Sequence, residues 1–296
     1  MISSTNDVTL GKRGRSFKNF IIGLIKKGGV NDRYIQYLID DTAMDLYAKA
    51  FTNPTADPEN NYEMLEKLGD STCNKAIVWY IYRKVPKLSL KPQGVMLISR
   101  ISHVLRSKET FANIGIKLGF EDFISSGIMT IKNGEQKRVM SVKRNSVVED
   151  CFEAFFGATE LLIDTRVKYG IGFAITQDII KALLDEYPFP SIRYEDLFDP
   201  ITRLKELFDY QKFTFPDGAT GNLGSYKYID GVFDENRQLK TVLVEYTDRK
   251  GMKKTICSGM GAIKDTAKEF AAEAALKYFR QFGYEKKPPY DYKDFL

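Results

Sequence analysis

Two acidic segments, far apart in the chain, limit the possible folds most strongly. The first, residues 61–70, reads NYEMLEKLGD and spaces Glu63, Glu66 and Asp70 three and four residues apart. On an α-helix this spacing stacks the three carboxylates along one face, where like charges repel. A hard divalent cation with oxygen ligands would relieve that repulsion. Taken alone, the segment is explained more simply as an acidic, solvated helix face.

The second segment, residues 145–158, reads NSVVEDCFEAFFGA. It places Asp150 and Glu153 one turn apart at the start of an apolar helix, so two helices could each supply two carboxylates to one site. Carboxylates beside a hydrophobic core are costly unless they are paired, which favours the metal site over the acidic surface. The apolar neighbours predict that both helices pack into a core: Leu65, Leu68, Phe152, Phe155 and Phe156.

The composition is that of a globular protein of about two domains. Of the 296 residues 43% are hydrophobic and 28% charged, and no apolar run approaches the ~20 residues of a membrane span. Cys73, Cys151 and Cys257 are far apart without CxxC spacing, so we expect neither a disulfide framework nor a zinc site. They favour a reducing intracellular compartment, cytoplasm or nucleus. His103 is the only histidine, which argues against histidine-based general-base chemistry.

Periodicity and breakers divide the chain into parts. The net charge of +5 is matched by residues 1–27, where six basic residues stand against one acid. Such a basic arm suits a phosphate-rich partner, or it serves solubility alone. The predicted parts are a basic flexible tail at 1–16, a helical domain at 17–187, a linker at 188–197, an α-β-β-β-α domain at 198–283 and a C-terminal tail at 284–296.

The two acidic segments together resemble the ribonuclease III family. The resemblance rests on Glu-x-Leu-Glu-x-Leu-Gly-Asp at 63–70 and Asp-x-Phe-Glu-Ala-x-x-Gly-Ala at 150–158. It implies an all-α ribonuclease III endonuclease domain that binds Mg²⁺, with Mn²⁺ as a possible substitute, through Glu66, Asp70, Asp150 and Glu153. Asp70 and Glu153 would be the catalytic residues. It also implies a homodimer formed through the helix of the first segment, with two centres that cut opposite strands.

This sequence departs from the family pattern at two places in the first domain. Thr52-Asn53-Pro54-Thr55 stands where the family often has Thr-His-Arg-Ser, and Lys67 stands where it usually has a phenylalanine that helps to form the subunit contact. The second departure predicts a rearranged or weaker dimer interface.

Other expectations concern local structure. We expect single helices at about 32–51 and 60–84, and a loop-like, basic lobe at 121–144 that is either close to RNA phosphates or plainly solvated.

The segment 259–268, before an alanine-rich helix, resembles the last part of a double-stranded RNA-binding domain. By that resemblance Lys264 and Lys268 would lie over phosphates, with Arg237 and Lys240 as further RNA contacts. Asp265 reverses one charge of the usual adjacent lysine pair, and residues 234–240 replace the usual Gly-Pro-x-His loop. Both RNA binding and a purely architectural role therefore stay open for this domain.

The resulting functional prediction is a magnesium-dependent endoribonuclease for double-stranded RNA. It would hydrolyse phosphodiesters with two metal ions and leave 5′-phosphate and 3′-hydroxyl ends with short 3′ overhangs. The alternatives are a non-catalytic scaffold that binds double-stranded RNA, and a silencing suppressor that sequesters RNA. Retention of all four carboxylates favours the enzyme over the scaffold. No membrane partner is expected.

Overall fold

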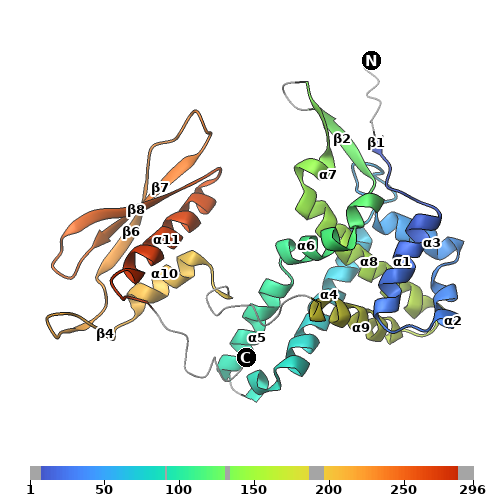
Figure 1. The fold of residues 1–296 in the computed structure, drawn as a ribbon, viewed down its shortest axis with the longest axis horizontal. Coiled ribbons are helices and arrows are strands. Elements are labelled where there is room, and N and C mark those ends of the chain that lie inside the picture. Colours follow the sequence, from blue (N-terminus) through green and yellow to red (C-terminus); the bar gives the residue numbers. More distant parts are fainter. Residues whose placement is uncertain (1–7, 91, 131–133, 187–196, 286–296) are drawn as a thin grey trace. The chain divides into compact units, whose positions relative to one another are not determined.

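The computed structural model describes residues 8–90, 92–130, 134–186 and 197–285 (Figure 1). The chain forms two units, residues 1–192 and 193–296. In the first, the elements are β1 (Val8–Thr9), α1 (Arg15–Lys27), α2 (Asp32–Ile35), η1 (Gln36–Leu38), α3 (Asp41–Ala50), α4 (Glu63–Lys84), η2 (Pro86–Leu90), α5 (Pro92–Leu105), α6 (Lys108–Leu118), η3 (Phe120–Phe123), β2 (Ser126–Thr130), β3 (Gln136–Arg138), α7 (Val139–Val142), α8 (Arg144–Arg166) and α9 (Ile171–Asp185).

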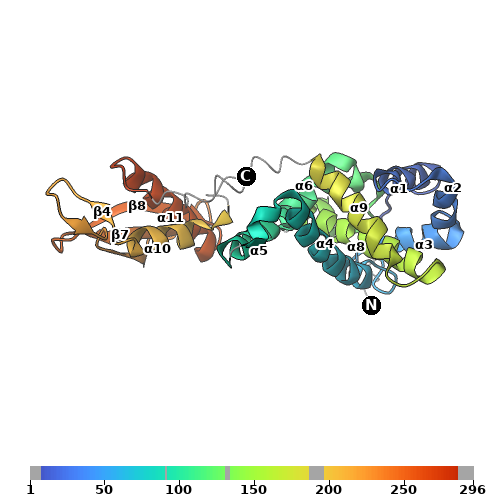
Figure 2. The same cartoon turned by 90° about the horizontal axis from the view of Figure 1, so that it is seen from below.

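Helices α4 and α8 form the centre of the first unit. They lie side by side with α9 in both Figure 1 and Figure 2. Helix α6 also packs against α8. Helix α8 is buried around most of its circumference, because its apolar residues are not confined to one stripe. A cluster of aromatic rings joins α8 to α1, α3 and η3, with centroids 4.4 to 6.4 Å apart: Phe17, Phe20, Phe51, Phe120, Phe123, Phe152 and Phe155.

Two glycines let α4 and α8 approach to backbone contact. A Cβ atom on Gly69 would lie 1.8 Å from the carbonyl oxygen of Glu153, and one on Gly157 would lie 2.0 Å from that of Leu65. No side chain fits at either position, so the contact requires glycine on both helices. This crossing fixes the first acidic segment against the second.

The expected mobile tail at residues 1–16 is wrong for its second half. Val8 and Thr9 pair with Gly127 and Ser126 of β2, and α1 already begins at Arg15. The Arg13 guanidinium donates to the Phe123 carbonyl at 2.5 Å and to Ser125 Oγ at 3.1 Å. Basic residues in this segment are therefore used in part to fasten the chain end; residues 1–7 lie outside the described part.

Three local predictions in the first unit need correction. The helix expected at 32–51 is broken, because the Asp40 carboxylate accepts from the Ala43 N–H at 2.8 Å and starts a new helix there. The helix expected at 60–84 begins at Glu63. The lobe at 121–144 is not a loop but contains η3, the β2–β3 hairpin and α7, with β2 as the middle strand of three.

The second unit has an α-β-β-β-α order, as predicted. Its elements are α10 (Pro200–Asp209), β4 (Phe213–Thr214), β5 (Thr220–Gly221), β6 (Ser225–Asp230), β7 (Lys240–Thr247), β8 (Lys253–Gly261) and α11 (Lys264–Arg280). Strands β6, β7 and β8 form an antiparallel sheet with β7 in the middle, and the short β4–β5 pair was not predicted. Both predicted fold classes, an all-α domain followed by an α+β domain, are confirmed.

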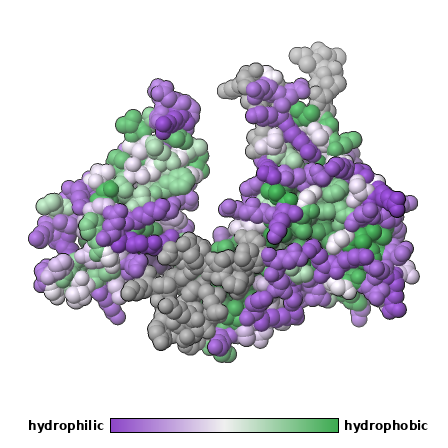
Figure 3. Space-filling model, in the orientation of Figure 1, coloured by the Kyte–Doolittle hydropathy of each residue, from purple (hydrophilic) through white to green (hydrophobic). Residues whose placement is uncertain are grey.

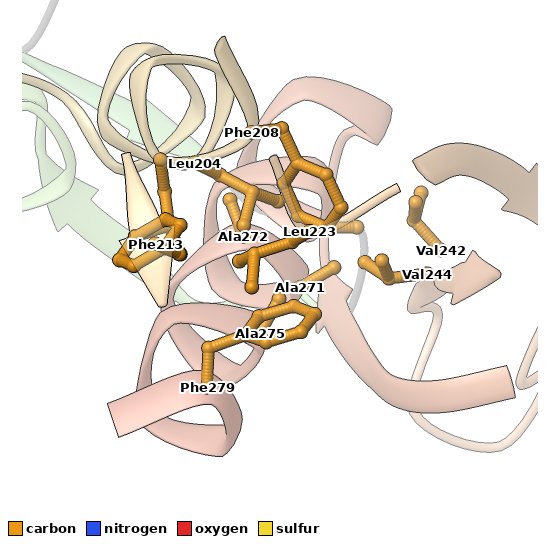
Figure 4. Packing of buried hydrophobic residues seen from close by; sticks show 12 residues of the cluster. Leu204, Phe208, Phe213, Leu223, Val242, Val244, Ala271, Ala272, Ala275 and Phe279 are labelled. Carbon is orange, nitrogen blue, oxygen red and sulfur yellow. The ribbon is translucent and has the colours of Figure 1, made fainter. Parts of the chain in front are cut away.

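A separate hydrophobic core holds the second unit together. The alanines of α11 pack against the sheet, and Phe208 of α10 and Phe279 of α11 meet edge to face with centroids 5.2 Å apart (Figure 4). Tyr284 also packs on Phe213, with ring centroids 5.4 Å apart, so the predicted C-terminal tail begins too early at 284. The predicted linker at 188–197 lies outside the described residues except for Leu197, and so does the tail from 286 on.

The surface of both units is mixed. On the face drawn in Figure 3, hydrophilic and hydrophobic residues alternate over each unit. Among the described helices, none combines the length and the apolar character that a membrane-spanning segment requires.

Candidate active site

The four predicted carboxylates lie around the crossing of α4 and α8. Helix α4 supplies Glu66 and Asp70, on either side of Gly69, and α8 supplies Asp150 and Glu153. Because Gly69 contacts the Glu153 backbone directly, the two pairs belong to one region of the molecule. Within the described residues, no three acidic, histidine or cysteine side chains stand close enough together to hold a metal ion in their present rotamers.

Burial and mutual repulsion raise the pKa values of carboxyl groups in this site. Glu153 is only 7% exposed, and burial, followed by repulsion from Glu149, Asp70, Glu66 and Asp150, raises its pKa to about 8. Burial, with repulsion from Asp150 as the next cause, raises the pKa of Glu66 to about 7. The site therefore carries more negative charge than its own surroundings stabilise. An all-oxygen set of this kind fits Mg²⁺ or Mn²⁺ by the chemistry of its donors.

Hydrogen bonds orient one carboxylate on each helix. The Tyr62 hydroxyl donates to Asp150 Oδ2 at 2.7 Å and accepts from Asn53 Nδ2 at 2.8 Å. Asn53 belongs to the segment that departs from the family's Thr-His-Arg-Ser, so this chain uses an asparagine there to hold Tyr62. On α4, Asn74 Nδ2 donates to Asp70 Oδ1 at 2.9 Å. Such supporting bonds limit the rotamers of the carboxylates.

Sequence reasoning missed Glu149. Ser146 and Glu149 have the spacing of a capping box, but α8 begins at Arg144, and Ser146 Oγ accepts from Lys108 Nζ at 3.1 Å. Glu149 faces the other acids, and burial raises its pKa despite the nearby Lys108. The adjacent Glu149 and Asp150 were the available signal.

Comparison with known proteins decides the family. The sequence profile of the ribonuclease III domain matches residues 63–162. A relative of the ribonuclease 3 type from Invertebrate iridescent virus 6 is 32% identical over 282 residues, which cover 91% of this chain and 89% of the relative. The chain belongs to the ribonuclease III family.

Two further proteins are similar to this chain. A relative of the ribonuclease 3 type from Frog virus 3 (isolate Goorha) is 32% identical over 265 residues, which cover 89% of this chain and 63% of the relative. The nuclease domain of ribonuclease III from Campylobacter jejuni is 20% identical with a TM-score of 0.39, and the match covers 57% of this chain and 96% of that domain. By the family profile and the relative from Invertebrate iridescent virus 6, the predicted enzyme class, an endoribonuclease of the ribonuclease III type, is confirmed.

The ribonuclease III helix α4 also carries an exposed face beside the acids. Met64 is 64% and Leu68 38% exposed, and Lys67 lies between them at the surface. Glu63 is exposed as well and takes no part in the described hydrogen bonds to the four carboxylates. Met64, Lys67 and Leu68 thus form an exposed, partly apolar face of α4.

The residues predicted to contact RNA gather at one end of the second unit. Lys240 starts β7 and pairs with Gly261 at the end of β8, and Lys264 starts α11 shortly after it. Lys264 Nζ lies 2.7 Å from Asp230 Oδ1, and the Lys268 ammonium lies 4.8 Å from the centroid of the Tyr228 ring. Arg237 is exposed in the β6–β7 loop, 4.0 Å from Asp234. Acidic neighbours thus accompany two of these four cations, Lys264 and Arg237.

Two arginines of the basic lobe at 121–144 form hydrogen bonds within the protein. Arg144 Nε and Nη2 donate to the two carboxylate oxygens of Glu121 at 2.5 and 2.7 Å, and Arg138 donates to Ser126 Oγ at 2.9 Å. Both guanidinium groups are engaged within the protein. These bonds join residues within the lobe to one another.

Proposed function

We propose that this protein cleaves double-stranded RNA by divalent-metal-dependent phosphodiester hydrolysis. The products would be 5′-phosphate and 3′-hydroxyl ends with short 3′ overhangs. The proposal rests on the position of the carboxylates: α4 and α8 each place two of them at the Gly69–Gly157 crossing. Two of these groups, Glu66 and Glu153, have raised pKa values. Raised pKa values mean that neighbouring negative charges disfavour ionisation of these carboxyl groups. A bound cation would offset that repulsion.

Glu66, Asp70, Asp150 and Glu153 are the residues that would hold the metal ions. When bound, two magnesium ions would lower the pKa of the attacking water and neutralise charge on the phosphate and the leaving 3′ oxygen. Asp70 follows Gly69, and the Glu153 backbone contacts Gly69 at the crossing; these two acids are proposed as the catalytic pair. Tyr62 and Asn74 hold Asp150 and Asp70 in place, and Glu153 is buried.

We propose that the second unit binds the duplex and that the enzyme is a homodimer. The cluster of Lys240, Lys264 and Lys268 supports the first role, since cations at a helix N-terminus suit phosphates. The exposed Met64 and Leu68 on α4 support the second. The three free thiols are consistent with a reducing intracellular compartment.

The test of this function is cleavage of a long perfect RNA duplex. Purified protein with Mg²⁺ is expected to reduce it to short pieces with 5′-phosphate ends, and the same protein in excess EDTA is expected to leave it intact. Gel analysis with end labelling reads both outcomes. Binding of the duplex without any metal-dependent cleavage would instead support the non-catalytic scaffold.

Tyr62 is expected to set the metal requirement. In Tyr62→Phe the Asp150 carboxylate loses its donor, so the Mg²⁺ concentration for half-maximal cleavage should rise about 10-fold. Tyr82→Phe is the matched control, because Tyr82 is exposed on the same helix. The measurement is a Mg²⁺ titration of the cleavage rate for both variants. Identical titration curves would show that Tyr62 does not position Asp150.

A further inference from the structure

The junction of α5 and α6 brings two cations to the acidic site. Lys108, the first residue of α6, has its Nζ 3.3 Å from Glu149 Oε2 and 3.1 Å from Ser146 Oγ. Two residues earlier, Arg106 Nη1 donates to Asn74 Oδ1 at 2.6 Å, and Asn74 in turn donates to Asp70. One turn of chain therefore places positive charge beside α8 and beside α4.

Lys108 lies on the open side of these acids. Its side chain is 55% exposed, whereas the Glu149 side chain that it contacts is 15% exposed. Its charge also reaches Asp150: burial raises the pKa of that carboxyl, and the Tyr62 hydrogen bond and then the Lys108 charge oppose the rise. The ammonium is thus at the boundary between the carboxylates and solvent, which is where a polyanion would arrive.

A site made of carboxylates repels an RNA strand, so a cation at its rim has a definite use. A lysine ammonium is a compact charge with three donors on a flexible stem, and it binds phosphate as a point charge. The contact with Glu149 holds the ammonium near the site before substrate arrives. Ser146 Oγ restricts it further, because the hydroxyl accepts one of its protons.

We propose that Lys108 contacts a non-bridging oxygen of the phosphodiester that is cut. The assignment rests on the proposed function of the site, to which it adds a substrate contact outside the four carboxylates. Lys108 would exchange part of its interaction with Glu149 for the phosphate when the strand binds. It would then stabilise negative charge that develops on the phosphate during hydrolysis.

The first test compares three variants in single-turnover cleavage of a saturating RNA duplex with Mg²⁺. Lys108→Met is expected to slow cleavage about 100-fold, as for loss of one charged donor in other enzymes, while Lys108→Arg retains most of the rate. The control is Lys117→Met, the same change at the exposed far end of α6, which should cleave like the wild type. Equal rates for Lys108→Met and Lys117→Met would overturn the proposal.

The second test measures binding and does not need cleavage. In a Glu153→Gln background, duplex affinity is measured against salt concentration with and without Lys108→Met. Loss of one phosphate contact should reduce the slope of log affinity against log salt by about 0.9. An unchanged slope overturns the contact even if cleavage falls, because Lys108 would then act only through Glu149. Absence of cleavage by the wild type would refute the proposed function. The slope would then still show whether Lys108 contacts a phosphate.

Discussion

Replacement of Glu153 by glutamine is expected to abolish cleavage and to stabilise the metal-free protein. Cleavage should fall at least about 1,000-fold, because the change removes a proposed metal ligand from the centre of the site. The free energy of unfolding in EDTA should rise by about 2 kcal/mol, because the glutamine removes a charge that burial and four neighbouring carboxylates oppose. Urea unfolding at pH 8 and a cleavage assay measure the two effects.

The stability effect has a defined pH dependence. Because the pKa of Glu153 is about 8 in the folded protein and its ordinary value is 4.5, the folded protein binds more protons than the unfolded chain between these pH values. Stability of the metal-free wild type should therefore fall as pH rises from about 5 to about 8, and Glu153→Gln should flatten that slope. Asp178→Asn, a similar change on the exposed face of α9, is the control. A variant less stable than the wild type at pH 8 would contradict the charge argument.

Replacement of Gly69 by alanine is expected to disrupt the first unit. The new Cβ would lie 1.8 Å from the Glu153 carbonyl oxygen, a backbone atom that cannot rotate away, so α4 and α8 must separate. We expect a loss of at least about 3 kcal/mol in the free energy of unfolding, together with loss of cleavage. Thermal unfolding followed by circular dichroism measures the first and the duplex assay the second.

Gly23→Ala is the matched control for Gly69→Ala. Gly23 also lies within a helix, α1, but a Cβ there meets nothing within 4 Å. Since alanine favours helix over glycine by about 0.5–1 kcal/mol, this variant should be as stable as the wild type or slightly more so. If Gly69→Ala behaved like Gly23→Ala, the close crossing of the two helices would be wrong.

The sequence was informative where chemistry and spacing coincide. The carboxylates on 61–70 and 145–158 could be predicted to share a site, because residue type, helix register and the flanking apolar residues all agreed. The order of helices and strands in the second unit followed from periodicity in the same way. What these patterns share is that each depends on neighbours in sequence.

Features that depend on distant neighbours were not predictable. Nothing in residues 8–13 shows that β2 will accept a strand from them, and Ser146 with Glu149 matches a capping box although Lys108, distant in sequence, takes Ser146 instead. The same holds for Tyr62, whose bond to Asp150 joins residues 88 positions apart. In each case the local sequence allows more than one conformation or hydrogen-bond partner, and a tertiary contact determines which one forms.

The N-terminal strand has a practical consequence for anyone who shortens this protein. Gly11 and Arg13 both bond to Ser125 Oγ, while the Ser125 carbonyl accepts from the Asn53 N–H at 2.9 Å. Asn53 holds Tyr62, which holds Asp150. A truncation or fusion point after residue 8 would therefore disturb the position of the Asp150 carboxylate, more than a hundred residues downstream. Truncations for expression should end before Val8.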